Sequence, residues 1–455
     1  MLICARIGIR RGLISGAIAV VLLAALAAAF ASAAAAAPGD QAWVKKYLPA
    51  GGWSTMNVLV ATAPTGDIYV AASVKALASP HKGSLMVARY ASSGSRKWAK
   101  TYSVGGSFDN VPTALVPDSD GNVIVAGYTS SASAGEDWLL VRYTRGGQRS
   151  WVRRAGRSGV DDRIVGAVTS GSGRVVVAGQ TAVSATDTNW MVSECRPNGT
   201  WTWRYTRANL AGMWDSPVAI ARGADGSLYI TGYDTTIAGD ADAVLVKLRR
   251  NGSSSWVRTW SSALALHDRP ADVAVSSAGV AVVGRRDTGG STSQGLVIKY
   301  TLGGVLEWSE SYTGVVGGND WLQAAGIDAS GRVFAGGAIS TWVDHSDYAV
   351  LLWGADGTRL GTQGWLSDPS AIAPGVHDMV VTSDGAAYVT GDLCEASRSL
   401  DAYTVAIGAD WGPRWFGMYD NAGEAESAWS LALTTSAVYV GASTPGGITL
   451  IKYVR

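Results

Sequence analysis

The residues with the clearest chemical potential are tryptophans that stand beside carboxylates. Trp214 precedes Asp215, Trp321 follows Asp320, and Asp268 lies between them in a similar sequence setting. An exposed indole can cover the apolar face of a sugar ring while a carboxylate accepts hydrogen bonds from its hydroxyl groups. These five residues are the predicted ligand-binding residues. The alternative is ordinary packing of the indoles, with each Asp holding a loop.

Carboxylates also recur at two regular positions. The first series comprises Asp109, Asp162, Asp215, Asp268, Asp320 and either Glu424 or Glu426, and the second comprises Asp137, Asp242, Asp347 and Asp401. A ring of converging oxygens could bind a cation. Regular recurrence favours a structural role instead, in which each Asp accepts backbone N–H bonds. The sequence therefore predicts no metal site.

The four histidines, His81, His267, His345 and His377, are predicted to lie in long loops. A zinc site needs three or four converging ligands, so surface histidines are the favoured interpretation. The sequence contains no Gly-x-Ser-x-Gly elbow, no His-Glu-x-x-His pair and no phosphate-binding loop before a helix. We therefore predict no cofactor and no catalytic residue.

Composition narrows the class of protein. The chain has 455 residues and a formal net charge of +1, which argues against nucleic acid or an anionic membrane as the main partner. Only 16% of the residues are charged, whereas 57 are Gly and 19 are Trp. Few charges with many glycines, β-branched residues and tryptophans are typical of an all-β protein with many turns.

Residues 1–37 have the pattern of a signal peptide. Arg6, Arg10 and Arg11 precede the apolar stretch "LISGAIAVVLLAALAAAF", and the small residues of "ASAAAAAP" predict cleavage near 33–37. The alternative is an uncleaved membrane anchor, because the apolar run is long enough to span a bilayer. Cleavage predicts a secreted protein with no remaining membrane attachment.

A four-strand pattern repeats through residues 38–455. Each repeat holds an inner strand such as "PTALVPD", then "NVIVAGY", then "DWLLVRY", then a strand that begins near a Trp. Closely spaced short strands separated by turn residues predict antiparallel sheets, and their radial repetition predicts a β-propeller. An open stack of sheets would need polar caps at both ends.

The ends of the repeat series indicate a closed ring. The chain begins with a lone outer strand in "AWVKKYL" and ends on a third strand in "ITLIKYVR". Joining them completes eight blades and removes the exposed edges. We therefore predict an all-β, single eight-bladed β-propeller of four-stranded antiparallel blades, closed by the N-terminal strand, with seven blades or a split pair of rings as the alternative.

The repeat resembles bacterial β-propeller repeats of the SBBP type. The matching segments are "DWLLVRYTRGGQRSW" followed by "AVTSGSGRVVVAGQT", and "DAVLVKLRRNGSSSW" repeats the first part. The spacing Gly-x-x-x-Trp also looks like the docking motif of eight-bladed quinoprotein propellers, although their vicinal Cys pair is absent. The resemblance implies an exported propeller and no particular activity.

The strand order predicts two different faces. Short turns join the first to the second and the third to the fourth strand on one face, so the longer links lie on the other face, where binding residues tend to gather. We expect an exported, non-enzymatic protein that binds a carbohydrate or a cell-envelope protein there. A polysaccharide hydrolase or lyase using a pair such as Asp215 and Asp268, and a protein-interaction scaffold, are the alternatives. Cys195 and Cys394 fall on opposite sides of the ring, so no disulfide is expected.

Overall fold

The computed structural model describes the propeller region with short gaps. It covers residues 36–48, 53–76, 83–104, 109–131, 135–157, 159–209, 212–264, 266–290, 292–314, 318–342, 345–365, 375–394, 400–421 and 424–455. Residues 38–455 form one unit. The predicted signal peptide lies almost entirely outside the described residues. Within the described ranges, no helix is long and apolar enough to cross a bilayer.

The described strands number 32 and pair into eight four-stranded antiparallel sheets. The inner strands are β2 (Trp53–Thr62), β6 (Asn110–Pro117), β10 (Arg163–Gly171), β14 (Ser216–Arg222), β18 (Asp268–Ser276), β22 (Trp321–Ile327), β26 (Gly375–Val381) and β30 (Ser427–Leu433). The second strands are β3 (Ile68–Ala76), β7 (Val123–Ser131), β11 (Arg174–Ser184), β15 (Leu228–Thr235), β19 (Gly279–Gly289), β23 (Val333–Trp342), β27 (Ala387–Cys394) and β31 (Ala437–Thr444). The third strands are β4 (Gly83–Tyr90), β8 (Gly135–Tyr143), β12 (Asp187–Cys195), β16 (Ala241–Leu248), β20 (Thr292–Tyr300), β24 (His345–Trp353), β28 (Leu400–Ile407) and β32 (Gly447–Val454). The outer strands are β5 (Arg96–Tyr102), β9 (Arg149–Ala155), β13 (Trp201–Arg207), β17 (Ser254–Trp260), β21 (Leu306–Tyr312), β25 (Arg359–Trp365), β29 (Pro413–Tyr419) and β1 (Gln41–Tyr47).

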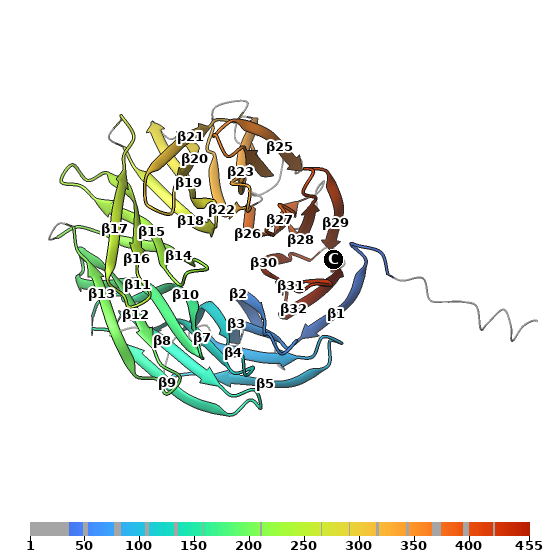
Figure 1. The fold of residues 1–455 in the computed structure, drawn as a ribbon. Helices are drawn as coiled ribbons and strands as arrows, with labels where there is room; N and C mark the ends of the chain where they lie inside the picture. The colour runs from blue at the N-terminus through green and yellow to red at the C-terminus, as the bar shows by residue number, and fades with distance from the viewer. Residues whose placement is uncertain are drawn as a thin grey trace, which may run out of the picture. The chain divides into compact units, whose positions relative to one another are not determined.

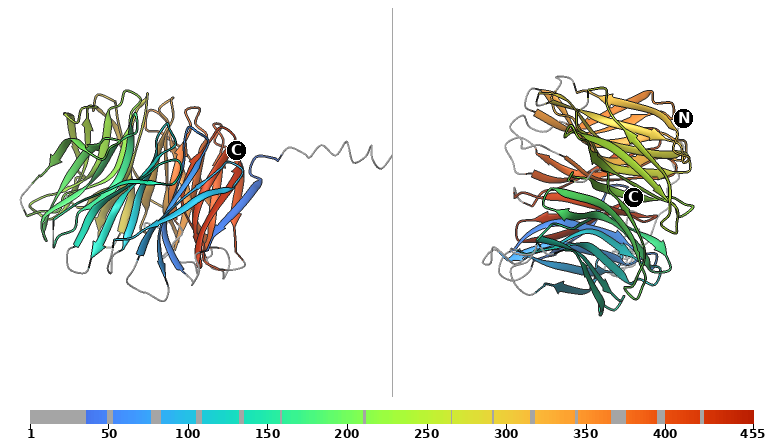
Figure 2. Two further views of the ribbon diagram at one scale, coloured as in Figure 1. Left: turned by 90° about the horizontal axis from the view of Figure 1, so that it is seen from below. Right: turned by 90° about the vertical axis from the view of Figure 1, so that its left-hand side faces the viewer.

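The sheets are the blades of a closed ring. Each inner strand contacts the inner strand of the next blade, and β30 of blade 8 contacts β2 of blade 1 (Figure 1). Seen edge-on, the strands run from one face of the ring to the other (Figure 2). The predicted eight-bladed propeller is confirmed. The second and third strands are almost wholly buried because neighbouring blades cover both of their faces, and this explains their continuous apolar sequences.

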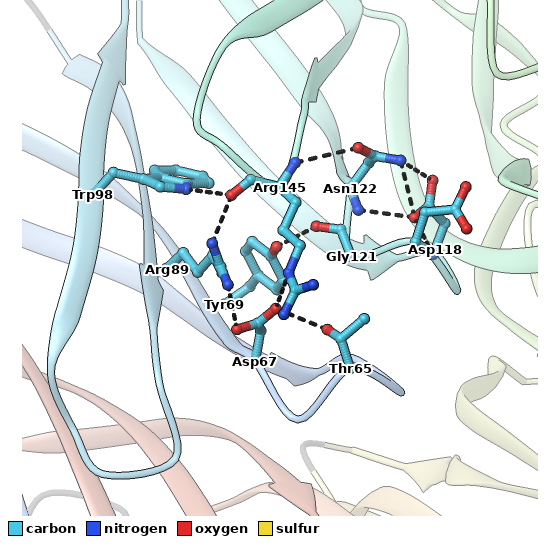
Figure 3. Close-up of polar contacts among 10 residues, drawn as sticks. Thr65, Asp67, Tyr69, Arg89, Trp98, Asp118, Gly121, Asn122 and Arg145 are labelled. Carbon is cyan, nitrogen blue, oxygen red and sulfur yellow. Dashed lines mark hydrogen bonds and ion pairs between the residues drawn. The ribbon is translucent and has the colours of Figure 1, made fainter.

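Neighbouring blades are joined by a pair of hydrogen bonds that the repeat encodes. In blade 1, Trp98 Nε1 and Arg89 Nη1 each donate to the carbonyl oxygen of Arg145 at 2.9 Å, in the β8–β9 turn of blade 2 (Figure 3). The same arrangement recurs with Arg142 and Trp151 at Pro197, Lys247 and Trp256 at Leu302, Lys299 and Trp308 at Ala355, and Lys452 and Trp43 at Ser92. The basic residue of "LVKY" and the Trp of the outer strand therefore act together.

In four of these five turns a glycine receives the indole, whereas in the turn at Pro197 the glycine, Gly199, lies against the guanidinium of Arg153. Gly147 has a φ of 84°, and a Cβ built on it would lie 2.8 Å from Cγ of Trp98. The φ value favours glycine because L side chains rarely adopt it. The glycine of "TRGGQ" therefore serves both the turn and the packing of the preceding blade, which explains the fixed spacing of Gly and Trp.

Blade 8 contains both ends of the propeller. The two ends make the same backbone hydrogen bonds as a turn between a third and an outer strand. Strand β1 pairs antiparallel with β32, as Figure 1 shows in blue and red. The N–H of Gly39 donates to the carbonyl of Val454 at 2.8 Å, and the N–H of Val454 donates to the carbonyl of Asp40 at 3.0 Å. In the corresponding turn of blade 1, Gly94 and Ala91 make the same pair of bonds. A Cβ on Gly39 would lie 2.6 Å from Cβ of Trp415, so Gly39 also occupies the place of a turn glycine.

Candidate functional site at the mouth of the central channel

Every inner strand carries a β-bulge that turns one residue toward the centre of the ring. Near the start of each inner strand the register against the second strand slips once, and in β2 it skips two residues. Strand β10 has a second shift near its end. The skipped residues are Asn57 and Val58, Thr113, Val165, Val218, Ala271, Gln323, His377 and Trp429. A bulge re-aims a side chain without breaking the sheet. In blades 2 to 7 the residue before the skipped position is buried and the skipped one is half-buried.

The ring of bulge residues changes character around the channel. Val165, Val218 and Ala271 are small and apolar, whereas Gln323, His377 and Trp429 on the next three blades carry polar or aromatic groups. A cavity of about 420 Å³ lies where these two halves meet. It is lined by Val218, Pro270, Ala271, Trp321, Gln323, Val376, His377 and Trp429. Because Trp321 opens β22, the cavity lies toward the face of the longer links.

His377 is fixed by two neighbours. Its Nε2 lies 3.1 Å from Oδ2 of Asp392, and its ring meets Trp429 edge to face with centroids 5.1 Å apart. Asp392 also accepts the backbone N–H of Ala428 in blade 8 at 3.0 Å. The prediction that His377 lies in a loop is wrong, because His377 belongs to strand β26 and faces the channel.

The two indoles of the lining come from blades 6 and 8 and have different partners. Trp429 donates from Nε1 to Ser443 Oγ at 2.9 Å, so its orientation is set by the second strand of its own blade. The guanidinium of Arg285 lies 5.3 Å from the ring centroid of Trp321 and supports one side of that indole. Trp321 nevertheless remains 43% exposed. The cavity thus combines aromatic surface with an imidazole and an amide that can bind hydroxyl groups.

Two carboxylates lie deeper, in a second channel cavity of about 360 Å³. Asp272 accepts the N–H of Ala325 and Asp378 accepts the N–H of Leu431, each at 2.8 Å and each from the next blade. Burial raises the pKa of Asp272 to about 7 and that of Asp378 to about 6. These side chains brace adjacent inner strands from within the channel.

The three predicted carboxylates have structural partners. Asp215, Asp268 and Asp320 are fully buried at separate blade junctions. Asp320 accepts the N–H of Gly314 at 2.7 Å and that of Ser340 at 2.6 Å, and Asp215 likewise accepts two backbone N–H groups. Asp268 accepts the N–H of Ser262 at 2.6 Å, and burial raises its pKa to about 6. These contacts are the ones that the structural role requires, and Oδ1 of Asp268 has no partner among the described residues.

The predicted tryptophans separate into two settings. Trp321 lines the channel cavity, whereas Trp214 is 53% exposed before β14 and is absent from the residues that line the two channel cavities. Trp138 and Trp190 are fully buried and donate to carbonyl oxygens of the next blade, at Gln180 and Tyr233.

Several other sequence predictions concern residues that are only partly described. Cys195 is a buried free thiol. His81 and the side chains of Trp53, Trp342, His345 and Cys394 lie outside the described residues.

Sequence reasoning missed Gln323, His377 and Trp429 as one group. Each stands at the bulge of its inner strand, a position that a repeat-by-repeat comparison isolates because the equivalent residues elsewhere are small. The bulge itself leaves no mark in a pattern of alternating hydrophobicity, so the sequence did not reveal which residue turns inward.

Comparisons with known proteins identify no family for this chain. A comparison with models of protein families gave no match, and a comparison with curated proteins gave none either. Among solved structures, the chain is similar to a protein of unknown function from Dyadobacter fermentans, with 12% sequence identity and a TM-score of 0.42. The alignment covers 92% of this chain and 100% of that chain. The assignment as a β-propeller therefore rests on the strand pairing described above.

Proposed function

We propose that the protein binds a neutral carbohydrate in the channel-mouth cavity, without acting on it chemically. The observation that carries this proposal is the departure from the repeat, in which Gln323, His377 and Trp429 join Trp321 on one side of the channel. A cavity of about 420 Å³ is within the usual range for small-ligand sites, roughly 300–1,000 Å³. The indoles offer surface for a sugar ring, and the imidazole and amide offer partners for hydroxyl groups.

The alternative of a polysaccharide hydrolase or lyase lacks the support that Asp215 and Asp268 were expected to give. A catalytic pair needs carboxyl groups that face one space at a suitable separation. Both side chains are buried at different junctions and accept backbone N–H bonds. Asp215 and Asp268 therefore hold the links between blades in place, and their positions do not favour a hydrolase or lyase.

Export and family likeness belong to the same proposal. The signal-peptide pattern of residues 1–37 supports a secreted protein that meets glycans of the cell envelope, and N-terminal sequencing of the secreted form would locate the cleavage site. The likeness to SBBP-type repeats stays part of this proposal and rests on the matching sequence segments, whose Lys or Arg, Trp and turn glycine recur between blades of this chain.

A glycan-array screen of residues 38–455 tests the proposal. We expect a specific glycan to bind, with its affinity lowered about tenfold or more in Trp321→Ala and Trp429→Ala, because stacking on an aromatic ring is lost. Trp214→Ala is the matched control, since it removes an exposed indole outside the channel cavities. Melting temperatures would confirm that all variants are folded.

The opposite effect of these substitutions would place the binding site elsewhere. Loss of binding in Trp214→Ala, with retention in the two channel variants, would place the site on the outer links, where the sequence alone predicts it. A blank array with folded protein would contradict carbohydrate binding and favour a partner protein of the cell envelope or a scaffold role.

A further inference from the structure

Three carboxylates converge at the junction of blades 7 and 8. Asp401 belongs to β28, Asp420 directly follows β29, and Glu426 directly precedes β30. One oxygen from each can be chosen so that all three lie within 4.8 Å of one another. It is the one group of three potential metal ligands found among the residues that the structure describes.

The same three positions are less acidic at other junctions. Strand pairing defines the equivalence, since Ala402 pairs with Tyr419 as Trp138 pairs with Ala155 and Ala243 with Trp260. The corresponding trios are Asp137, Gly156 and Asp162; Asn189, Ala208 and Asp215; Asp242, Ser261 and Asp268; and Gln294, Thr313 and Asp320. At these junctions one or two positions are acidic and the last is Asp. The junction of blades 7 and 8 has three acidic residues, and the last is the longer Glu.

Glu426 supplies an independent sign of a ligand. Its side chain is fully buried, and Oε2 accepts the N–H of Asn421 at 3.3 Å. Its Oε1 has no hydrogen-bond partner among the described residues. At the same place in the repeat, Asp215 and Asp320 use both oxygens, whereas Oδ1 of Asp268 also has no partner among the described residues. Glu426 differs from Asp268 in that two further carboxylates converge with it. A buried carboxylate oxygen without a partner is costly unless a cation or a proton compensates it.

The nearby charges do not neutralise this oxygen through any described contact. Asp401, Asp420 and Glu424 stand close to Glu426 and add negative charge to its surroundings. Lys46 of β1 is close, but its Nζ donates to Asn421 Oδ1. The amide nitrogen of the same side chain, Asn421 Nδ2, donates to Glu424 Oε2 at 2.9 Å.

We propose that Asp401, Asp420 and Glu426 bind a hard divalent cation, Ca²⁺ in the first place. Carboxylate oxygens are the ligands that Ca²⁺ prefers, and its flexible shell of about 6–8 oxygens accepts water where protein ligands end. The ion joins the outer part of blade 7 to the first strand of blade 8, the blade that β1 closes. This proposal departs from the sequence-based prediction of no metal site, and it places a cation at one junction only.

Calorimetric titration of residues 38–455 with CaCl₂, after removal of metals with EDTA, tests this site. We expect one ion per chain, with affinity lowered at least about tenfold in Asp420→Asn and in Glu426→Gln, since even outer-shell changes weaken metal sites by that amount. Asp242→Asn is the matched control, because Asp242 occupies the place of Asp401 at a junction with only two carboxylates. Its Ca²⁺ affinity should equal that of the unaltered protein.

Three results would overturn all or part of this proposal. Absence of Ca²⁺ binding to folded, unaltered protein, or unchanged affinity in Asp420→Asn, would overturn the proposal. Asp420 is exposed, so this variant should fold even if Glu426→Gln does not. A parallel titration with MgCl₂ checks the ion, and tighter binding of Mg²⁺ would overturn the assignment to Ca²⁺. Glycan binding by the channel mouth is independent of either result.

Discussion

At the scale of single residues, the buried carboxylates fasten the links between blades. Asp320 receives one N–H from Gly314 in the preceding link and one from Ser340 near the end of β23, so a single side chain ties the link to the second strand of its blade. Asp109 stands at the same place in blade 2, but its side chain is 43% exposed and accepts the N–H of Gly83 at 3.1 Å.

This difference predicts unequal effects of the same substitution. Asp320→Ala should lower the free energy of unfolding by about 2–4 kcal/mol, because two buried N–H groups lose their acceptor. Asp109→Ala should cost clearly less. Urea denaturation of both variants measures this. If Asp320→Ala kept its stability but lost glycan binding, Asp320 would act as the ligand residue that the sequence predicts.

Buried acids with raised pKa values also predict how stability depends on pH. The pKa of Asp272 rises from an ordinary 3.8 to about 7 in the folded protein, so between these values the folded state holds a proton that the unfolded state releases. Stability must therefore fall as pH rises through this interval, and each pKa unit corresponds to about 1.4 kcal/mol. Asp378 acts in the same direction.

We expect the melting temperature to decrease from pH 5 to pH 8, and to decrease less in Asp272→Asn. Asp356→Asn is the control, because the pKa of the exposed Asp356 is lowered by hydrogen bonds from Thr358 and does not titrate in this interval. A melting temperature that stays level or rises between pH 5 and pH 8 would contradict the argument.

At the scale of elements, the outer strand and the next turn form one docking unit. Trp98 of β5 inserts over Gly147 in the β8–β9 turn, and the turn offers the carbonyl of Arg145 to the indole. Gly66 occupies a turn with the same hydrogen bonds and a similar φ of 78°, but no atom lies within 4 Å of a Cβ built on it.

Alanine at these two glycines separates backbone strain from packing. Both variants carry the strain of a left-handed residue, about 1–2 kcal/mol. Gly147→Ala must in addition displace Trp98, and overpacking of this kind typically costs about 1–3 kcal/mol. Chemical denaturation should therefore show Gly147→Ala to be the less stable variant by that difference. Equal stabilities would mean that the indole moves away without loss.

At the scale of the whole molecule, the ring is closed by a turn-like contact between the first and the last residues of the propeller. No peptide bond joins the two segments. Gly39, Asp40 and Val454 reproduce the hydrogen bonds of the Ala91–Ser95 turn in blade 1. By this equivalence Arg455 and Pro38 correspond to Ser92 and Ser93.

A circular permutant tests whether the stability of the propeller depends on where the chain begins and ends. Joining Arg455 directly to Pro38 and opening the chain between Ser92 and Ser93 should give a protein that melts within a few degrees of the original, because the same blade architecture is kept. Removing residues 38–48 should instead leave β32 unpaired and cause aggregation. Failure of the permutant to fold, shown by circular dichroism, would mean that blade 8 needs its own open ends.

The eight-bladed architecture could be predicted from the amino-acid sequence. The eight Trp-containing repeats, the lone first strand in "AWVKKYL" and the last strand in "ITLIKYVR" define both the blade count and its closure. This was possible because β-strand alternation and turn glycines are local, and a closed ring is the arrangement that pairs every edge. Loop-holding by Asp was predictable for the same reason, since its regular recurrence follows the fold.

The side chains that meet in the channel and at the junction of blades 7 and 8 could not be predicted from the sequence and became evident in the folded protein. His377 and Trp429 are 52 residues apart in number and touch because two bulges turn them toward a common axis. Asp401, Asp420 and Glu426 converge because three strand ends from two blades share one corner. Such contacts depend on register and on packing between sheets, and a periodic sequence pattern specifies neither for a single side chain.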